Sequence, residues 1–140
     1  SCELLELVNQ DTEAFNEVMG ALRLPKATDE ERRERRQAIQ SATRRATEVP
    51  LRIVELALDV LVLAKEMALH GNKNALSDAG VAGLLAAAAC RGAAYNVLIN
   101  LPGLKDEEFV AAAKRRLEVL LGQAKTLEEV IDAHVRGVLG

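Results

Sequence analysis

The fold is decided by residues 51–69, LRIVELALDVLVLAKEMAL. This stretch is apolar on nearly every side of a helix. Its solvated face is one narrow stripe, formed by Arg52, Glu55, Asp59 and Glu66. Such a helix has to be covered on most of its surface by other elements. A chain of 140 residues is enough for one domain and too short for two ordinary ones. A second subunit is therefore an expected part of that cover.

The segments around this stretch are predicted to be helical as well. Prolines occur at Pro25, Pro50 and Pro102, each where a helix could begin or end, and alternating strand patterns are absent. Residues 28–31 form a capping box for one helix start, and Pro50 is expected to kink that helix or to begin a new one. The predicted fold is all-α, an up-and-down bundle of about five helices that forms a dimer. The bundle is expected to be one domain over residues 1–140. The first three predicted helices span residues 3–22, 28–49 and 51–69. The fourth is expected to begin within residues 74–78 and to end near residue 96 or 100, and the last spans residues 106–138.

Composition excludes several classes of function. The net charge is −3 and aromatic residues are 2%, so the chain is not expected to bind nucleic acid. The most apolar segment, residues 81–90, is about half as long as a membrane span. Cys2 and Cys90 have no metal-ligand spacing, so no metal site is expected. A cytoplasmic, reducing compartment is the predicted location.

Asp11 interrupts an otherwise apolar stripe on the first helix. That predicted stripe consists of Leu4, Val8, Phe15, Val18 and Leu22. A carboxylate on an inner face is desolvated, which raises its pKa and suits proton transfer near neutral pH. The alternative is an acid that turns outward or pairs with a buried arginine.

Two further pairs of polar residues are candidate ligand contacts. Asn96 and Asn100 share one helix face, and an amide both donates and accepts, which fits the mixed edge of a pterin or purine. Alternatively, Asn96 bonds its own helix and Asn100 caps its end. Ser77 and Asp78 follow a polar loop and are typical capping residues. The alternative there is a helix start whose N–H groups bind an anionic group.

Five stretches together resemble the cyclodeaminase part of formiminotransferase-cyclodeaminase. Their order and spacing agree with that family across essentially the whole chain. They are residues 7–16 (LVNQDTEAFN), 24–26 (LPK), 48–51 (EVPL), 71–78 (GNKNALSD) and 92–101 (GAAYNVLINL). The resemblance implies an all-helical oligomer with a dimer as its building unit.

The resemblance also assigns the catalytic aspartate of the family to Asp11. Two features depart from the family pattern. Asn9 stands at a position that is often acidic, so a neighbouring charge is missing. The family usually has a Gly/Ala/Ser-rich helical segment before residues 7–16, and that segment is expected to be missing here.

The implied activity belongs to one-carbon metabolism and histidine degradation. The family converts 5-formiminotetrahydrofolate to 5,10-methenyltetrahydrofolate and ammonia, and close bacterial relatives act as methenyltetrahydrofolate cyclohydrolases. The implied partners are a tetrahydrofolate derivative and a second copy of the chain, with the site at or near the dimer interface and no cofactor beyond the folate substrate. Asn96, Asn100, Ser77 and Asp78 would position that substrate. The alternative from another class is a non-catalytic helical assembly module.

Overall fold

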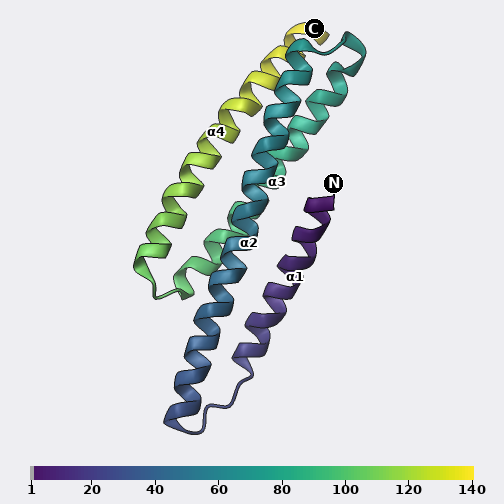
Figure 1. Cartoon of the computed structure of the whole chain (residues 1–140). Helices are drawn as coiled ribbons and strands as arrows, with labels where there is room; N and C mark the ends of the chain where they lie inside the picture. The colour runs from purple at the N-terminus through teal and green to yellow at the C-terminus, as the bar shows by residue number, and fades with distance from the viewer. Residues whose placement is uncertain (1) are drawn as a thin grey trace.

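The computed structural model describes residues 2–140, with side chains from residue 3 onward, so the Cys2 thiol lies outside the described part. Four α-helices make up nearly all of this part, and two short 3₁₀ helices stand in the connections before and after the third (Figure 1). The helices are α1 (Cys2–Leu22), α2 (Asp29–His70), η1 (Lys73–Ala75), α3 (Leu76–Asn100), η2 (Leu101–Gly103) and α4 (Glu107–Leu139). The predicted all-α class is confirmed, and the predicted number of about five helices is slightly too high.

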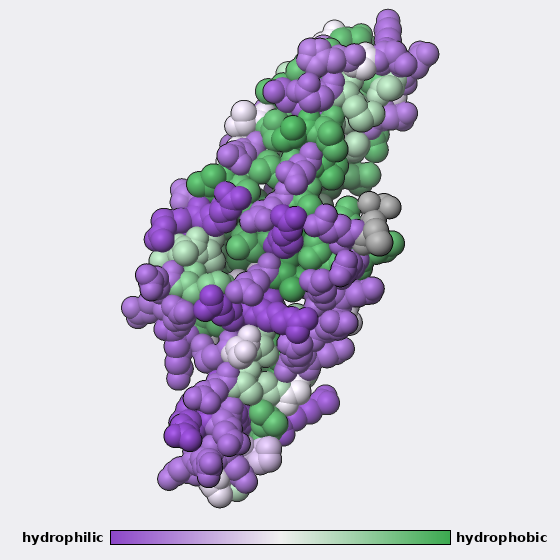
Figure 2. Space-filling view, viewed as in Figure 1, coloured by the Kyte–Doolittle hydropathy of each residue, from purple (hydrophilic) through white to green (hydrophobic). Residues whose placement is uncertain are grey.

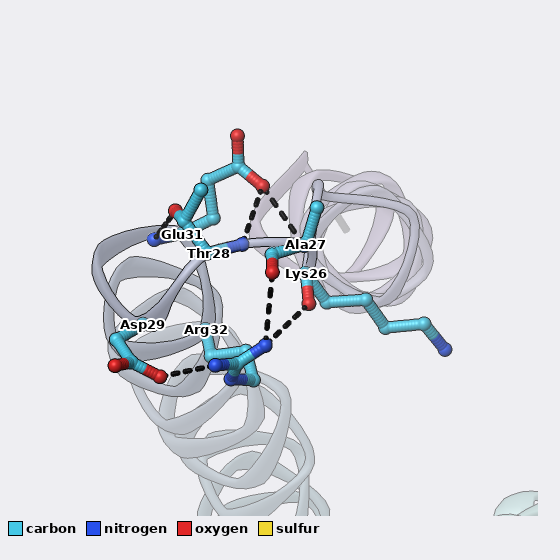
Figure 3. Close-up of polar contacts among 6 residues, drawn as sticks. All are labelled: Lys26, Ala27, Thr28, Asp29, Glu31 and Arg32. Carbon is cyan, nitrogen blue, oxygen red and sulfur yellow. Dashed lines mark hydrogen bonds and ion pairs between the residues drawn. The ribbon is translucent and has the colours of Figure 1, made fainter.

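The turn between α1 and α2 is fixed by the predicted capping box (Figure 3). The hydroxyl of Thr28 accepts from the Glu31 N–H at 3.1 Å, and the Glu31 carboxylate accepts from the N–H groups of Thr28 and Ala27 at 3.3 and 2.9 Å. Arg32 donates to the carbonyls of Lys26 and Ala27, each at 3.1 Å. The N–H of Glu31, one of the orphan donors of the helix start, is thereby satisfied, and these contacts hold the turn in which the chain reverses direction.

Pro50 lies inside α2, so the alternative in which it begins a new helix is wrong. Proline has no N–H, so the carbonyl of Ala46, four residues earlier, loses its helical donor. The side-chain amide of Asn100 supplies a replacement, because its Nδ2 donates to the Ala46 oxygen at 3.1 Å. Pro50 itself is buried. The helix runs on through the proline because a neighbouring helix satisfies the carbonyl that the proline leaves unpaired.

The main core lies where the second half of α2 meets α3 and α4. Its largest fully buried side chains include Leu61, Leu120, Val54 and Val97. Two glycines of α3 let α4 approach closely, since a Cβ on Gly83 would lie 3.1 Å from Ile131 Cδ1 and one on Gly80 would lie 3.3 Å from Val135 Cγ2.

A smaller core joins α1 to α2, and here the predicted inner face of α1 is wrong. Leu4, Val8, Phe15 and Leu22 are exposed. The packed residues of α1 are instead Leu7 and Ala14, which lie against Ala46 and Val49. Within the described residues, α2 is the one long helix that packs closely on α1. One neighbour cannot cover so broad an apolar surface, and the side with small alanines is the side that approaches it.

The molecular surface differs between the two ends of the bundle. In the view of Figure 2, hydrophilic side chains gather over the α1–α2 turn, and hydrophobic side chains gather toward the end where α2 and α3 meet. The stretch Lys73–Gly103 is long and apolar enough to cross a membrane by length and composition, with 39% of its most apolar window buried. The apolar stretch is therefore longer than residues 81–90, which the sequence analysis considered. A core helix of a soluble protein can have the same length and apolar composition.

Candidate active site

Asp11 lies on the face of α1 that packs against α2. The observed inner face runs Leu7, Asp11, Ala14, Val18 and Ala21, with the alternating four- and three-residue spacing of a packed helix. Leu7 and Ala14, one turn before and after, are buried at 6% and 0% exposure, and Asp11 is half-buried. The acid is therefore turned toward the neighbouring helix, as expected, although the stripe that contains it differs from the predicted one.

Three of the other four acids on α1 are engaged with arginines of α2. Glu17 pairs with Arg45, whose second amino group lies 3.7 Å from Glu13. Glu3 pairs with Arg52 at 3.0 Å. Among the described residues, the Asp11 carboxylate has neither a hydrogen bond nor an ion pair, so the alternative of an arginine-paired acid does not describe it. Its charge is available to a ligand.

Asn100 has a structural task at the carboxyl-terminal end of α3. Its amide donates to the carbonyls of Ala46 and Asn96, at 3.1 and 3.0 Å. The Asn96 side chain is exposed. Because Ala46 also packs in the cluster that holds Leu7 and Ala14, the structure brings this end of α3 and the Asp11 turn of α1 to the same stretch of α2.

Ser77 and Asp78 lie at the opposite end of α3, in its first turn. Both are exposed, and α3 has no side-chain cap. The cap comes earlier, where Asn72 Oδ1 accepts from the Ala75 N–H at 3.0 Å, so the capping alternative for Ser77 and Asp78 is wrong. At 1.5 Å per residue, Ser77 and Asn96 are about 28 Å apart along the helix. Within one chain, the predicted substrate residues therefore form two separate groups.

Sequence reasoning missed a cavity of about 600 Å³ between α3 and α4. Its wall includes the ion pair between Arg91 and Glu128 at 2.7 Å, and this hydrogen bond raises the pKa of Arg91. Cys90 lines the cavity, donates weakly to the Val54 carbonyl at 3.7 Å, and has a thiol pKa raised by burial. The one sequence signal was Arg91, a lone charge inside an otherwise apolar run. In the described part of the chain, no group of three His, Cys, Asp or Glu side chains could hold a metal ion.

Comparison with known proteins shows which family the sequence resembles along most of its length. A sequence profile described as formiminotransferase-cyclodeaminase matches residues 1–119. The methenyltetrahydrofolate cyclohydrolase of Methylorubrum extorquens is 46% identical over 95% of this chain and 64% of that protein. The formimidoyltransferase-cyclodeaminase of Rattus norvegicus is 40% identical over 90% of this chain and 23% of that protein.

A solved structure agrees with the fold. The formiminotetrahydrofolate cyclodeaminase of Thermotoga maritima has a TM-score of 0.86 and 29% sequence identity, and the match covers 99% of this chain and 65% of that one. The chain thus spans less than two thirds of the length of each of these three proteins.

Proposed function

Because the chain belongs to the formiminotransferase-cyclodeaminase family, we propose that it acts on the single carbon carried between N5 and N10 of a tetrahydrofolate derivative. The leading reaction is the conversion of 5-formiminotetrahydrofolate to 5,10-methenyltetrahydrofolate and ammonia. The observation that carries the proposal is the position of Asp11, a half-buried acid on the packed face of α1 without a partner among the described residues. The resemblance to the family also implies that Asp11 is the catalytic aspartate.

The proposed reaction needs two proton transfers. N10 attacks the formimino carbon bonded to N5 and loses a proton, and the resulting tetrahedral carbon expels its amino group as ammonia after that nitrogen gains a proton. The Asp11 carboxylate accepts the first proton and, once protonated, donates the second. It also stabilises the cationic character that develops on the carbon and its nitrogens. No cofactor beyond the folate is required in this scheme.

Substrate positioning is assigned to the polar residues of α3. Ser77, Asp78 and Asn96 are exposed and free to bind the pterin or the carboxylates of the substrate. Asn100 contributes only its side-chain carbonyl oxygen, because its amide group is engaged with two backbone carbonyls. Much of the rate would come from holding N10 against the reacting carbon, since that alignment is intramolecular.

The cyclohydrolase reaction is the second candidate, favoured by the 46% identity to the Methylorubrum extorquens enzyme. Here water adds to the methenyl carbon, the bond from that carbon to N5 breaks, and 10-formyltetrahydrofolate forms. Asp11 would take a proton from the attacking water. Both reactions pass through a tetrahedral carbon between N5 and N10, so one acid serves either.

A homodimeric, cytoplasmic enzyme is the form we propose for the working protein. Exposed large apolar side chains occur on α1, α2 and α3, including Phe15, Leu63 and Ile99 at 62%, 63% and 77% exposure. Surfaces of this kind mark association sites in soluble proteins. They support equally the alternative of a non-catalytic helical assembly module, which binding of a reduced folate would exclude.

The test supplies the purified protein with each substrate separately. With 5-formiminotetrahydrofolate, we expect the absorbance of methenyltetrahydrofolate to rise together with one equivalent of ammonia. Loss of methenyltetrahydrofolate absorbance, faster than in a protein-free control, would instead identify the cyclohydrolase. If neither substrate turns over and no reduced folate binds saturably, the enzymatic proposal is wrong.

A further inference from the structure

The side-chain amide of Asn100 is held in one orientation by two backbone carbonyls. Its Nδ2 donates to the Ala46 carbonyl at 3.1 Å and to the Asn96 carbonyl at 3.0 Å. An amide nitrogen carries two hydrogens, so both donors of this side chain are used. Because a carbonyl only accepts, turning the amide over would set its oxygen against two other oxygens. The orientation is therefore fixed by the chemistry of the two partners.

The Oδ1 oxygen of the same amide is left open to a ligand. Asn100 is half-buried, and the described part of the chain contains no buried side-chain oxygen without a partner. Since this oxygen accepts no hydrogen bond from the described residues, it reaches solvent. An asparagine with a free amide turns to meet either a donor or an acceptor. Asn100 instead offers a fixed acceptor, which binds a group that carries an N–H or an O–H.

Pro50 is the reason that the amide of Asn100 is held in this way. In a regular helix, the N–H of residue 50 would donate to the Ala46 carbonyl. A proline has no N–H, so that carbonyl is free to accept from Asn100. The Pro50 ring is itself fully buried. It can therefore act on a substrate through Asn100 and not by contact.

The Ala46 turn of α2 also connects Asn100 to the proposed catalytic acid. Ala46 accepts from Asn100 and packs in one cluster with Leu7 and Ala14, which lie one turn before and after Asp11. Asp11 and Asn100 are both half-buried. Within the described residues, the Asp11 carboxylate and the Asn100 Oδ1 both lack a hydrogen-bond donor. A substrate that reaches both residues meets acceptor oxygens from each.

We propose that Pro50 is a positioning residue that determines specificity: through Asn100 it makes the site bind an N–H donor of the substrate and disfavour an acceptor in its place. Resting on the proposed function, the donor comes from the formimino nitrogen or from the N–H groups of the pterin. A matched ligand distinguishes these two sources. 5-Formyltetrahydrofolate has an oxygen acceptor in place of the formimino N–H and keeps the pterin unchanged.

Hydrogen exchange of the Asn100 side chain tests the geometry without any substrate. The two amide hydrogens are assigned by nuclear magnetic resonance through their loss in Asn100→Ala, and they should exchange slowly in the wild type. In Pro50→Ala the residue 50 N–H takes the Ala46 carbonyl, so at least one of the two should exchange at least about tenfold faster. Pro25→Ala is the matched control, because Pro25 is exposed in the α1–α2 turn. Equal rates in Pro50→Ala and the wild type would overturn the role of Pro50.

Specificity is tested by comparing the two ligands in Pro50→Ala and the wild type. The measured quantities are KM for 5-formiminotetrahydrofolate and the competitive inhibition constant Ki of 5-formyltetrahydrofolate. The ratio of Ki to KM should fall at least about fivefold in Pro50→Ala, because the freed amide can turn an N–H toward the formyl oxygen. A rise of KM and Ki by the same factor would place the donor on the pterin. Unchanged constants would overturn the proposal.

The role of Asn100 in binding is separated from its role in the fold by working in the Pro50→Ala background. There the Ala46 carbonyl has a helical donor, so Asn100→Ala removes the Oδ1 acceptor without leaving that carbonyl unpaired. KM should rise at least about fivefold relative to Pro50→Ala alone, with folding verified by circular dichroism. An unchanged KM would make Asn100 purely structural and overturn the proposal. A wild type without turnover would contradict the proposed function instead, and hydrogen exchange would still test the effect of Pro50.

Discussion

The two ends of α3 use their polar residues differently. At the carboxyl-terminal end, the amide of Asn100 is tied to α2, where it satisfies the carbonyl that Pro50 leaves without a donor. At the amino-terminal end, Gly80 and Gly83 pack against α4. In the described part of the chain, the exposed Ser77 and Asp78 side chains make no hydrogen bond or ion pair. A polar residue at one end therefore maintains the fold, while those at the other remain free for a ligand.

The largest expected effect on stability comes from removing the Asn100 amide at the carboxyl-terminal end of α3. Asn100→Ala should lower the free energy of unfolding by about 2 kcal/mol, because the buried Ala46 carbonyl loses its donor. In a Pro50→Ala background the loss should shrink to under about 1 kcal/mol, since residue 50 then has an N–H for that carbonyl. Urea denaturation of the four proteins at one protein concentration measures the coupling. Equal losses in both backgrounds would contradict the account of Pro50.

Overfilling the glycine contact should have a smaller effect. Gly83→Ala brings a methyl group to 3.1 Å from Ile131 Cδ1, and the strain is expected to cost about 1 kcal/mol after the gain in helix propensity. Gly122→Ala in α4 is the control, because its Cβ meets no atom within 4 Å, and it should stabilise by about 0.5–1 kcal/mol. Thermal unfolding compares the two, and stabilisation of both would show that the α3–α4 contact is not tight.

The buried thiol of Cys90, between the two ends of α3, should make the free energy of unfolding depend on pH. Burial raises the pKa of Cys90, so the unfolded chain loses its thiol proton at a lower pH than the folded chain. The stabilisation is complete below the unfolded pKa of about 8.5 and is lost as pH rises toward the folded pKa. In a Cys2→Ser background, unfolding midpoints between pH 7 and pH 10 should fall more steeply with Cys90 than with Cys90→Ala. Parallel curves would show that Cys90 does not contribute.

Substitutions at the amino-terminal end of α3 should change the stability least. Ser77→Ala and Asp78→Asn are expected to change the free energy of unfolding by less than about 0.5 kcal/mol, because both side chains are exposed. Each should nevertheless raise KM for the folate substrate. Denaturation and steady-state kinetics on the same preparations separate the two effects. A loss above about 1 kcal/mol would give these residues a structural role like that of Asn100.

Local patterns predicted the helices well and their packing less well. The capping box at Thr28 and the apolar periodicity placed helix ends within a few residues of those observed. The stripe on α1 was misjudged because Leu4, Val8 and Phe15 obey helical spacing as regularly as the packed residues do. Periodicity identifies apolar faces, but it does not say which face a single neighbouring helix will cover.

Long-range compensation was beyond a reading of local sequence. Pro50 predicts a kink or a break in an isolated helix, and the donor for the carbonyl that it leaves unpaired comes from Asn100, 54 residues along the chain from Ala46. Asn100 was a candidate substrate-binding residue because its amide can donate and accept. In the structure, its amide group donates to two backbone carbonyls instead. Position 11 belongs to both the exposed stripe and the packed stripe of α1. Asp11 was therefore identified as an acid on an inner face although the predicted stripe was the exposed one.

The central claim is that the Asp11 carboxylate moves protons in the folate reaction. The most direct measurement compares turnover of Asp11→Asn with that of Glu13→Gln, an acid on the same helix that lies near Arg45 and is 65% exposed. With folding verified by circular dichroism, Asp11→Asn should lose at least about 100-fold in kcat, and Glu13→Gln should stay close to the wild type. Wild-type turnover in folded Asp11→Asn would contradict the account.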